Sequence, residues 1–130
     1  MHFTYCPHCG EKLQPRPAGD EGLVPYCNTR KRYWFDWFYS CSIILVCNEY
    51  DEVVLCKQPH LSKEYESITS GFIKPGETAE ETARREVQEE LGLTVDKLVA
   101  EGTYWFGKGQ MLMHGFLGFA RKQPFHLSKE

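Results

Sequence analysis

The chain has 130 residues, 42% of them hydrophobic and 25% charged, as in an ordinary globular protein with room for one cored domain and a small appendage. The formal net charge of −3 and the pI of about 6.0 exclude a general attraction to nucleic acid or to anionic membranes. No apolar run reaches the ~18 residues that span a bilayer, and no secretory apolar segment opens the chain. We therefore expect a cytoplasmic protein with no membrane partner.

Three of the six cysteines, Cys6, Cys9 and Cys27, lie in an N-terminal segment rich in Pro and Gly. The spacing of the first two is typical of a zinc knuckle, because a tight turn brings both thiolates to one metal. A ribbon needs a second pair. Cys27 would open it, but three positions later stands Arg30, which stays protonated and cannot bind a metal. We expect a zinc-ribbon-like segment over residues 1–35.

Two interpretations of this segment stay open. In the first, His2, His8 or a more distant cysteine completes a tetrahedral Zn²⁺ site. In the second, the metal has been lost and the segment survives as a packing unit. The basic run at residues 30–32 is expected to be a solvated turn, and a zinc ribbon for nucleic acid is an alternative that depends on this run alone. Nucleic acid is therefore not an expected partner.

The next segments are aromatic and then apolar. Residues 33–40 form an aromatic cluster, for which packing is expected rather than a platform for stacked bases. Residues 41–48 are typical of a buried strand, and a turn at 48–52 leads into a second predicted strand at 53–58. The cysteines in these runs are expected to be small core residues: Cys41, Cys47 and Cys56.

A loop and a short strand are predicted over residues 59–70, and a helix after Thr78. Thr78 and Glu81 have the spacing of a capping box. Apolar residues then recur every four positions and should pack inward: Ala79, Ala83, Val87 and Leu91.

Two more strands are predicted after the helix, over residues 94–106 and 110–120, with a turn at 107–109 between them. At least four strands and one helix indicate the α+β class.

Three carboxylates, Glu86, Glu89 and Glu90, should share one strip of the helix, since side chains three and four positions apart are neighbours. Like charges ~4 Å apart repel by about 4 kcal/mol at an effective dielectric constant near 20. Such a strip is therefore expected to hold a cation, and a divalent metal is the natural one. The alternative, an acidic solvated helix without a metal, needs only one or two of these residues.

These residues carry a resemblance to a known family. Gly71, five further residues, Glu77, seven further residues and the run from Arg85 to Leu93 fit the Nudix box, GX5EX7REUXEEXGU, where U is aliphatic. With its N-terminal cysteines the chain resembles the NADH pyrophosphatase branch, whose members carry a four-cysteine ribbon before the Nudix domain. The resemblance implies a Nudix-type α/β/α sandwich with a mixed sheet over residues 36–130.

The resemblance also implies an enzyme, a metal-dependent pyrophosphatase that cleaves a diphosphate bond in a nucleoside diphosphate derivative such as NADH, NAD or ADP-ribose. Its implied Mg²⁺ or Mn²⁺ ligands are Glu86, Glu89, Glu90 and the carbonyl of Gly71. Glu89 is the first candidate for the general base or the key metal ligand. Arg85 and Glu77 are implied to form a charge pair that braces the loop against the helix.

The substrate motif of NADH pyrophosphatases, SQPWPFPXS, falls on residues 103–111, which keep only its aromatic character. Four residues are therefore candidates for binding a base, with ordinary strand packing as the alternative: Phe72, Trp105, Phe106 and Gln110. A non-catalytic Nudix-fold module that binds nucleotides or regulates is the alternative function that this departure favours.

The resemblance further implies another strand, a long helix that covers the sheet, and a late glutamate that reaches the metals. With one gap that glutamate matches Glu130, so the chain is expected to be incomplete and to lack the C-terminal helix. An apolar sheet face left uncovered would favour a homodimer.

Overall fold

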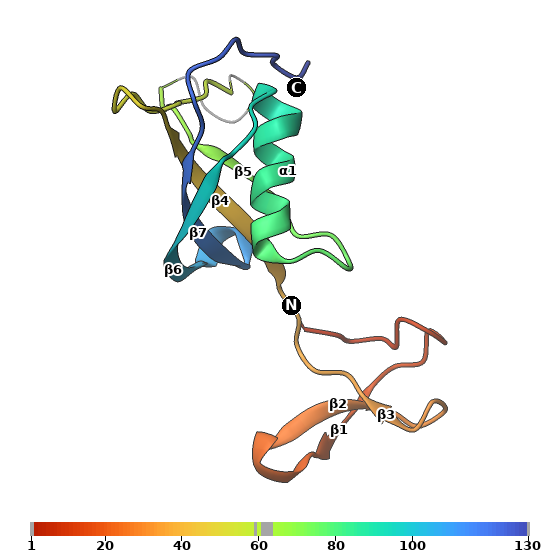
Figure 1. Cartoon of the computed structure of the whole chain (residues 1–130). Coiled ribbons are helices and arrows are strands. Elements are labelled where there is room, and N and C mark those ends of the chain that lie inside the picture. Colours follow the sequence, from red (N-terminus) through yellow and green to blue (C-terminus); the bar gives the residue numbers. More distant parts are fainter. Residues whose placement is uncertain (1, 59, 61–63, 130) are drawn as a thin grey trace. The chain divides into compact units, whose positions relative to one another are not determined.

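The computed structural model describes residues 2–58, 60 and 64–129, and the chain divides into two units, Met1–Phe38 and Tyr39–Glu130 (Figure 1). Glu130, the late glutamate of the resemblance, lies outside the described residues. No helix among the described residues is long and apolar enough to cross a membrane.

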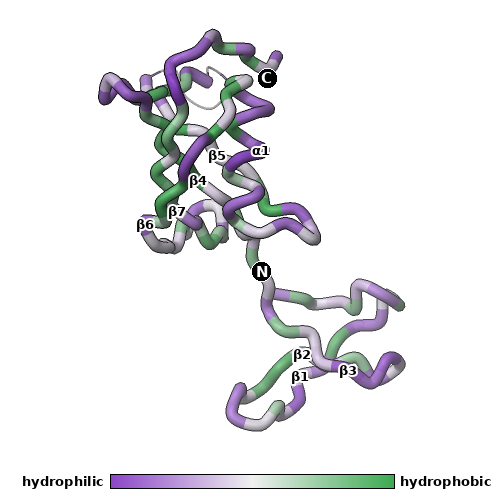
Figure 2. Tube along the Cα trace, in the orientation of Figure 1, coloured by the Kyte–Doolittle hydropathy of each residue, from purple (hydrophilic) through white to green (hydrophobic). Residues whose placement is uncertain are grey.

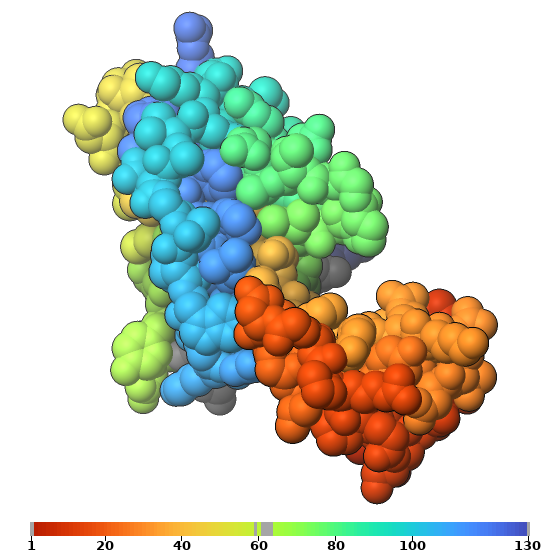
Figure 3. All heavy atoms as spheres, turned by 90° about the horizontal axis from the view of Figure 1, so that it is seen from below, coloured from red at the N-terminus to blue at the C-terminus, as the bar shows by residue number. Residues whose placement is uncertain are grey.

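The first unit is a small antiparallel sheet with thiols in its core. Its strands are β1 (Gln14–Pro17), β2 (Leu23–Cys27) and β3 (Arg32–Tyr33), in the order β1-β2-β3, with the short 3-10 helix η1 (Gly19–Glu21) after β1. Cys6, Leu13 and Cys27 form the buried cluster, with Phe3 and Trp34 packed against it. In the space-filling view the atoms of this unit, red to orange, form a packed body (Figure 3).

The second unit is a mixed four-stranded sheet with one helix on its face. Its elements are β4 (Tyr39–Cys47), β5 (Thr69–Phe72), α1 (Ala79–Leu91), β6 (Lys97–Phe106), the 3-10 helix η2 (Gly107–Gly109) and β7 (Met111–Phe119). The strand order is β5-β4-β7-β6; β4 and β7 run parallel, and the outer pairs run antiparallel. The predicted α+β class, the helix and the last two strands with their turn are confirmed.

The core lies between α1 and the sheet. Along α1, hydrophilic and hydrophobic residues alternate (Figure 2), and the inward positions Ala83, Val87 and Leu91 are buried as predicted. They pack on side chains from β4, β7 and the segment after α1: Ile44, Val46, Leu93, Val95, Phe116 and Ala120. This packing holds the helix, and with it the acidic strip, at a fixed place over the sheet.

The opposite face of the sheet is less covered. Side chains alternate between faces along a strand, so Ile43, Leu45, Leu117 and Phe119 point away from the core, and all four are only half-buried. A homodimer across this face stays a prediction.

The prediction of a strand over residues 53–58 is wrong. The turn after Asn48 forms as expected, but the returning chain meets the sheet through isolated bridges, such as Cys47 with Val53. β7 occupies one edge of β4 along its whole length, and β5 occupies the other edge at residues 41–44. Only the last residues of β4 are left to pair with the returning segment.

Candidate active site

The start of α1 is fixed by local bonds. The Thr78 side chain accepts the N–H of Glu81, and the Glu81 carboxylate accepts the N–H of Thr78, so the predicted capping box is present. Ser42 of β4, fully buried, donates its hydroxyl to the carbonyl of Ala79 at 2.7 Å. These bonds hold the first turn of the helix against the sheet.

Gly71 of β5 and Glu86 of α1 lie close together. A Cβ on Gly71 would lie 2.0 Å from Cδ of Glu86, well inside van der Waals contact. Any larger residue at position 71 would therefore push the carboxylate away. The glycine gives the Glu86 side chain, 13% exposed, its place beside the β5 main chain.

Arg85 is the centre of the charge network. Its Nε and Nη2 bind both carboxylate oxygens of Glu77, at 2.6 and 3.0 Å. Its Nη1 donates to Glu86 and, at 3.0 Å, to Glu89, while Nη2 also donates to the carbonyl of Phe72 at 3.0 Å. One guanidinium thus ties the loop, the strand end and two carboxylates of the strip together.

Glu77 is held as an anion by this network. The Arg85 guanidinium and the Thr82 hydroxyl, which donates at 2.8 Å, lower the pKa of Glu77 to about 2. Its carboxylate also accepts the N–H of Lys74 at 3.1 Å, which closes the loop before the helix. Glu77 in turn raises the pKa of Arg85, so this pair stays charged over the whole working range of pH.

The three carboxylates of the strip do not gather at one point. Glu86 lies near the Cys41 thiol, whose pKa is raised by burial and by the Glu86 charge. Glu90 lies near Cys56, whose pKa is raised by burial and by the Glu90 charge, against a hydrogen bond from Thr69. Among the described residues, the groups of three or more ligand atoms within 4.8 Å of one another do not include this strip.

The donor set fits a hard divalent cation. Carboxylate oxygens and a main-chain carbonyl are the ligands that Mg²⁺ and Mn²⁺ prefer, and Mg²⁺ keeps waters and substrate phosphates in its remaining positions. The Gly71 main chain is open to Glu86 because no Cβ stands between them. Glu89, 54% exposed, remains reachable from solvent.

The four predicted base-binding residues lie at one end of the sheet, where β5 and β6 finish and β7 begins. Phe72 is exposed, with its ring 5.1 Å from that of Tyr39. Trp105 and Phe106 are also exposed, and strand alternation puts them on opposite faces. Gln110 adopts a left-handed conformation after η2 and donates to the carbonyl of Gly107 at 2.9 Å.

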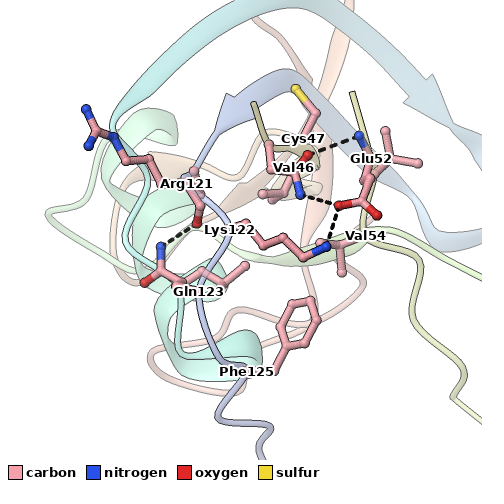
Figure 4. A pocket seen from close by; sticks show the side chains of 12 residues that line it. Val46, Cys47, Glu52, Val54, Arg121, Lys122, Gln123 and Phe125 are labelled. Atoms are coloured by element: carbon pink, nitrogen blue, oxygen red, sulfur yellow. Dashed lines mark hydrogen bonds and ion pairs between the residues drawn. The ribbon is translucent and has the colours of Figure 1, made fainter. Parts of the chain in front are cut away.

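Hollows open at the other end of the sheet, and two of them are considered for the site. The first, of about 250 Å³, lies between the end of β4 and the segment after β7, and Lys122 crosses it to bind Glu52 at 3.0 Å (Figure 4). None of the acidic strip lines it. The second, of about 650 Å³, is bordered by Glu90 together with Lys57 and His60. Of the two, only the second reaches the strip.

The predicted zinc residues are brought together. The Sγ atoms of Cys6, Cys9 and Cys27 all lie within 4.8 Å of one another, and Cys9 and Cys27 are 3.5 Å apart. Burial raises the pKa of Cys6, but the N–H groups of Cys9 and His8 and the neighbouring thiols outweigh it and lower the pKa to about 7. Burial, with Glu11 and the other thiols, raises the pKa of Cys27 to about 12.

Some contacts of these sites could not be predicted from the spacing of residues in the sequence. Glu11 reaches Cys27 across 16 positions, and Arg85 shares its guanidinium between three carboxylates. Cys41 and Cys56 are core residues as predicted: Cys41 is buried, and Cys56 packs against the core of the second unit.

Comparison with known proteins gives a family. A model of the NUDIX domain matches residues 38–126. Nudix hydrolase 19, chloroplastic, from Arabidopsis thaliana is 32% identical over 97% of this chain and 30% of its own length. The NAD-capped RNA hydrolase NudC of Pseudomonas aeruginosa is 31% identical over 88% of this chain and 40% of its own length. The chain thus spans less than half the length of these relatives.

A solved structure shows the same fold. The crystal structure of a NUDIX hydrolase from Nitrosomonas europaea superposes with a TM-score of 0.71 at 19% identity, over 98% of this chain and 73% of that one. At this identity the likeness concerns the fold.

Proposed function

The chain belongs to the Nudix family, and from this premise we propose that it hydrolyses a diphosphate bond in a nucleoside diphosphate derivative such as NADH, NAD or ADP-ribose. The observation that carries the proposal is the position of Glu86 against the main chain of Gly71. Glu89 binds the same guanidinium, that of Arg85. A solvated acidic helix would not require a glycine next to a carboxylate, or an arginine that binds two carboxylates.

The cation in this proposal is Mg²⁺ or Mn²⁺, held by Glu86, Glu89, Glu90 and the carbonyl of Gly71. When bound, the cation would neutralise charge on the phosphoryl oxygens and lower the pKa of the attacking water. The spread of the three carboxylates in the structure is compatible with a site that closes around cation and diphosphate together.

The residues of the chain then have separate tasks. Glu89 accepts the proton of the water whose oxygen attacks phosphorus, and the bridging P–O bond breaks to release two phosphate products. Its exposure gives water access to the carboxylate. Arg85 holds Glu86 and Glu89 in position, and Glu77 fixes Arg85 through both carboxylate oxygens. Glu77 is thus a positioning residue, and its loss should disturb geometry more than chemistry.

The base of the substrate is proposed to contact residues at this end of the sheet, the candidates being Phe72, Trp105, Phe106 and Gln110. Exposed aromatic faces support this, because bases stack on such faces whatever their sequence. Trp105 and Phe106 lie on opposite faces, so one base meets only one of these two. The name of the Pseudomonas relative adds an NAD-capped RNA end to the compounds worth testing, since such an end contains the same diphosphate bond.

A non-catalytic nucleotide-binding module is the second candidate. It is favoured by residues 103–111, which keep only the aromatic character of the substrate motif. Tight binding of ADP-ribose without turnover would support it, and turnover at ordinary enzymatic rates would remove it.

For the N-terminal residues we propose a zinc ribbon over 1–35, ahead of a Nudix domain over 36–130, with zinc on Cys6, Cys9 and Cys27. The convergence of three thiols supports it, since thiolates are preferred ligands of Zn²⁺. A cytoplasmic location is proposed because the six cysteines are thiols or metal ligands without disulfide partners.

The test is a substrate panel. The chain is incubated with NADH, NAD, ADP-ribose and a short NAD-capped RNA, with Mg²⁺ or Mn²⁺ and with or without EDTA, and the phosphate products are separated by chromatography. We expect cleavage of at least one compound that EDTA abolishes. No metal-dependent cleavage of any of them, by this chain or by a longer form containing it, would overturn the proposal.

A further inference from the structure

The thiol cluster of the first unit has three ligands where structural zinc takes four. Cys6, Cys9 and Cys27 converge, but Arg30 stands where a second knuckle would carry its other cysteine. Because structural Zn²⁺ sites are closed and tetrahedral, these three thiols need a fourth ligand.

The histidine side chains of this unit have other partners. Nδ1 of His2 pairs with Asp36 at 2.8 Å, and the ring of His8 packs against Trp34 with centroids 5.5 Å apart. Neither nitrogen set lies among the ligand atoms that gather within 4.8 Å in the described part of the chain.

Two of the remaining cysteines are bound within the sheet of the second unit. The Cys41 thiol donates to Met111 Sδ at 3.3 Å, and the Cys47 thiol donates to the carbonyl of Gly118 at 3.6 Å. The third, Cys56, lies beside Glu90. Each of the three thus has its own environment in that unit.

Glu11 is the carboxylate that meets the cluster. Its Oε2 accepts the S–H of Cys27 at 3.1 Å and the N–H of Thr29 at 3.0 Å. Its main-chain carbonyl accepts the N–H of Cys6 at 2.8 Å, so this residue is tied to both cysteine turns. Glu11 therefore lies beside the thiol that lacks its knuckle partner. Its carboxylate reaches Cys27 but is not among the ligand atoms that all lie within 4.8 Å of one another, so it has to turn toward Cys6 and Cys9 to bind a shared metal.

We propose that Glu11 supplies the fourth ligand, a carboxylate oxygen, to a zinc site formed with Cys6, Cys9 and Cys27. Zn²⁺ binds thiolates, so the Cys27 proton that now bridges to Glu11 leaves on binding. Thiolate and carboxylate would then repel each other at this separation unless one cation is shared between them. Carboxylate oxygens are established ligands of Zn²⁺.

The charge balance of this site is favourable. Three thiolates and one carboxylate around Zn²⁺ leave two negative charges, and the three protons of the thiols go to solvent. The basic run at residues 30–32 follows Cys27 in the same turn, and the main-chain N–H of Arg30 donates to Cys27 Sγ at 3.3 Å. This inference rests on the proposal that the three thiols bind zinc, and it is independent of the hydrolysis.

A double-mutant cycle distinguishes a ligand from a neighbour that only donates or accepts a hydrogen bond. The chain and its Glu11→Ala, Arg30→Cys and double variants are stripped of metal under reductant, and zinc stoichiometry and affinity are measured by competition with a chromophoric chelator. Glu21→Ala, an exposed glutamate of the same unit, is the control.

We expect one zinc per chain and a loss of at least about 100-fold in affinity for Glu11→Ala, since losing an outer-shell partner alone typically costs 10- to 100-fold. In the Arg30→Cys background, where a thiolate takes the fourth position, Glu11→Ala should cost less than about threefold. Restored affinity in the double variant also shows that Glu11→Ala has not failed simply by misfolding.

Three results would overturn the inference. Affinity of Glu11→Ala within about threefold of the unaltered chain would mean that solvent fills the fourth position. An equal loss in both backgrounds would make Glu11 an outer-shell partner of Cys27. Absence of zinc from the unaltered chain would remove the zinc proposal together with the role of Glu11, while leaving the hydrolysis, measured separately with Mg²⁺, untouched.

Discussion

The thiol cluster and the acidic strip differ in what surrounds them. In the first unit the thiols are themselves the core, since Cys6 and Cys27 are two of the three residues of its buried cluster. In the second unit nine of the described apolar residues form the core, and Glu86 and Glu89 lie beside it, bound to Arg85. A metal at the thiols would therefore hold a fold together, whereas a metal at the carboxylates would serve chemistry on a fold already formed.

Metal removal gives the largest expected effect, and it tests whether the two metals have these different roles. EDTA should reduce hydrolysis to the uncatalysed background, because Arg85, the cation bound to the strip, is already paired with Glu77, Glu86 and Glu89. Amide exchange in α1 should stay unchanged, while a zinc-selective chelator should speed exchange in β2 and leave α1 protected.

The measurement is hydrogen exchange followed by peptide, alongside turnover. The division between a structural and a catalytic metal would be wrong if EDTA alone sped up amide exchange in α1, or if the zinc-selective chelator left amide exchange in β2 unchanged.

Gly71→Ala should lower turnover strongly with a smaller effect on folding. The added Cβ would lie 2.0 Å from Cδ of Glu86, so the carboxylate must move. A displacement of about 1 Å at a reacting centre can cost about 100-fold in rate, while overpacking typically costs about 1–3 kcal/mol of stability.

Gly115→Ala is the control for this variant, because a Cβ there meets its nearest atom at an ordinary 3.4 Å. Steady-state kinetics and denaturant unfolding of both variants decide the matter. Equal turnover for the two variants would mean that the close approach of Gly71 and Glu86 has no role in hydrolysis.

Glu77→Gln should change the acid stability of the second unit. The pKa of Glu77 is lowered in the fold to about 2, below its ordinary value, so its ion pair adds stability above pH ~4.5. That stability is lost as the pH falls from there through the folded pKa.

The glutamine variant should therefore be less stable at pH 7, with a flatter dependence of stability on pH between about 4.5 and 2. Thermal unfolding across this range measures it. A slope as steep as that of the unaltered chain would mean that other carboxylates carry the acid sensitivity.

Thr78→Ala gives the smallest expected effect. It removes the side chain that accepts the Glu81 N–H at 3.1 Å, and loss of such a cap typically costs about 1 kcal/mol. Urea unfolding should show this loss with turnover nearly unchanged at 25 °C. A large fall in turnover at unchanged stability would mean that the helix start, and not only its packed face, positions the carboxylates.

The sequence predicted what is determined locally. The capping box of Thr78 and the four-residue apolar period of α1 gave the helix, and the apolar runs gave β4, β6 and β7. The strands of the first unit were not predicted individually, because Pro15, Pro17 and Pro25 stand inside them and proline disfavours strand pairing.

Contacts between distant positions could not be predicted in the same way. The segment at 53–58 has strand-like residues, and only the pairing of β4 with β5 shows why it stays out of the sheet. The Nudix box assigned Glu77 and Arg85 to one pair, but the sharing of Arg85 with Glu86 and Glu89 depends on rotamers that spacing does not fix. The contact of Glu11 with Cys27 likewise depends on how two turns fold together.

The turnover of Glu89→Gln tests whether the acidic strip carries the reaction while the fold is stable without it. Glu80→Gln makes the same charge change on an exposed residue of the same helix. We predict a loss of about 10²–10⁴-fold for Glu89→Gln, the usual worth of a general base, with the unfolding temperature and the activity of Glu80→Gln close to those of the unaltered chain. Unaltered turnover in Glu89→Gln would contradict the account.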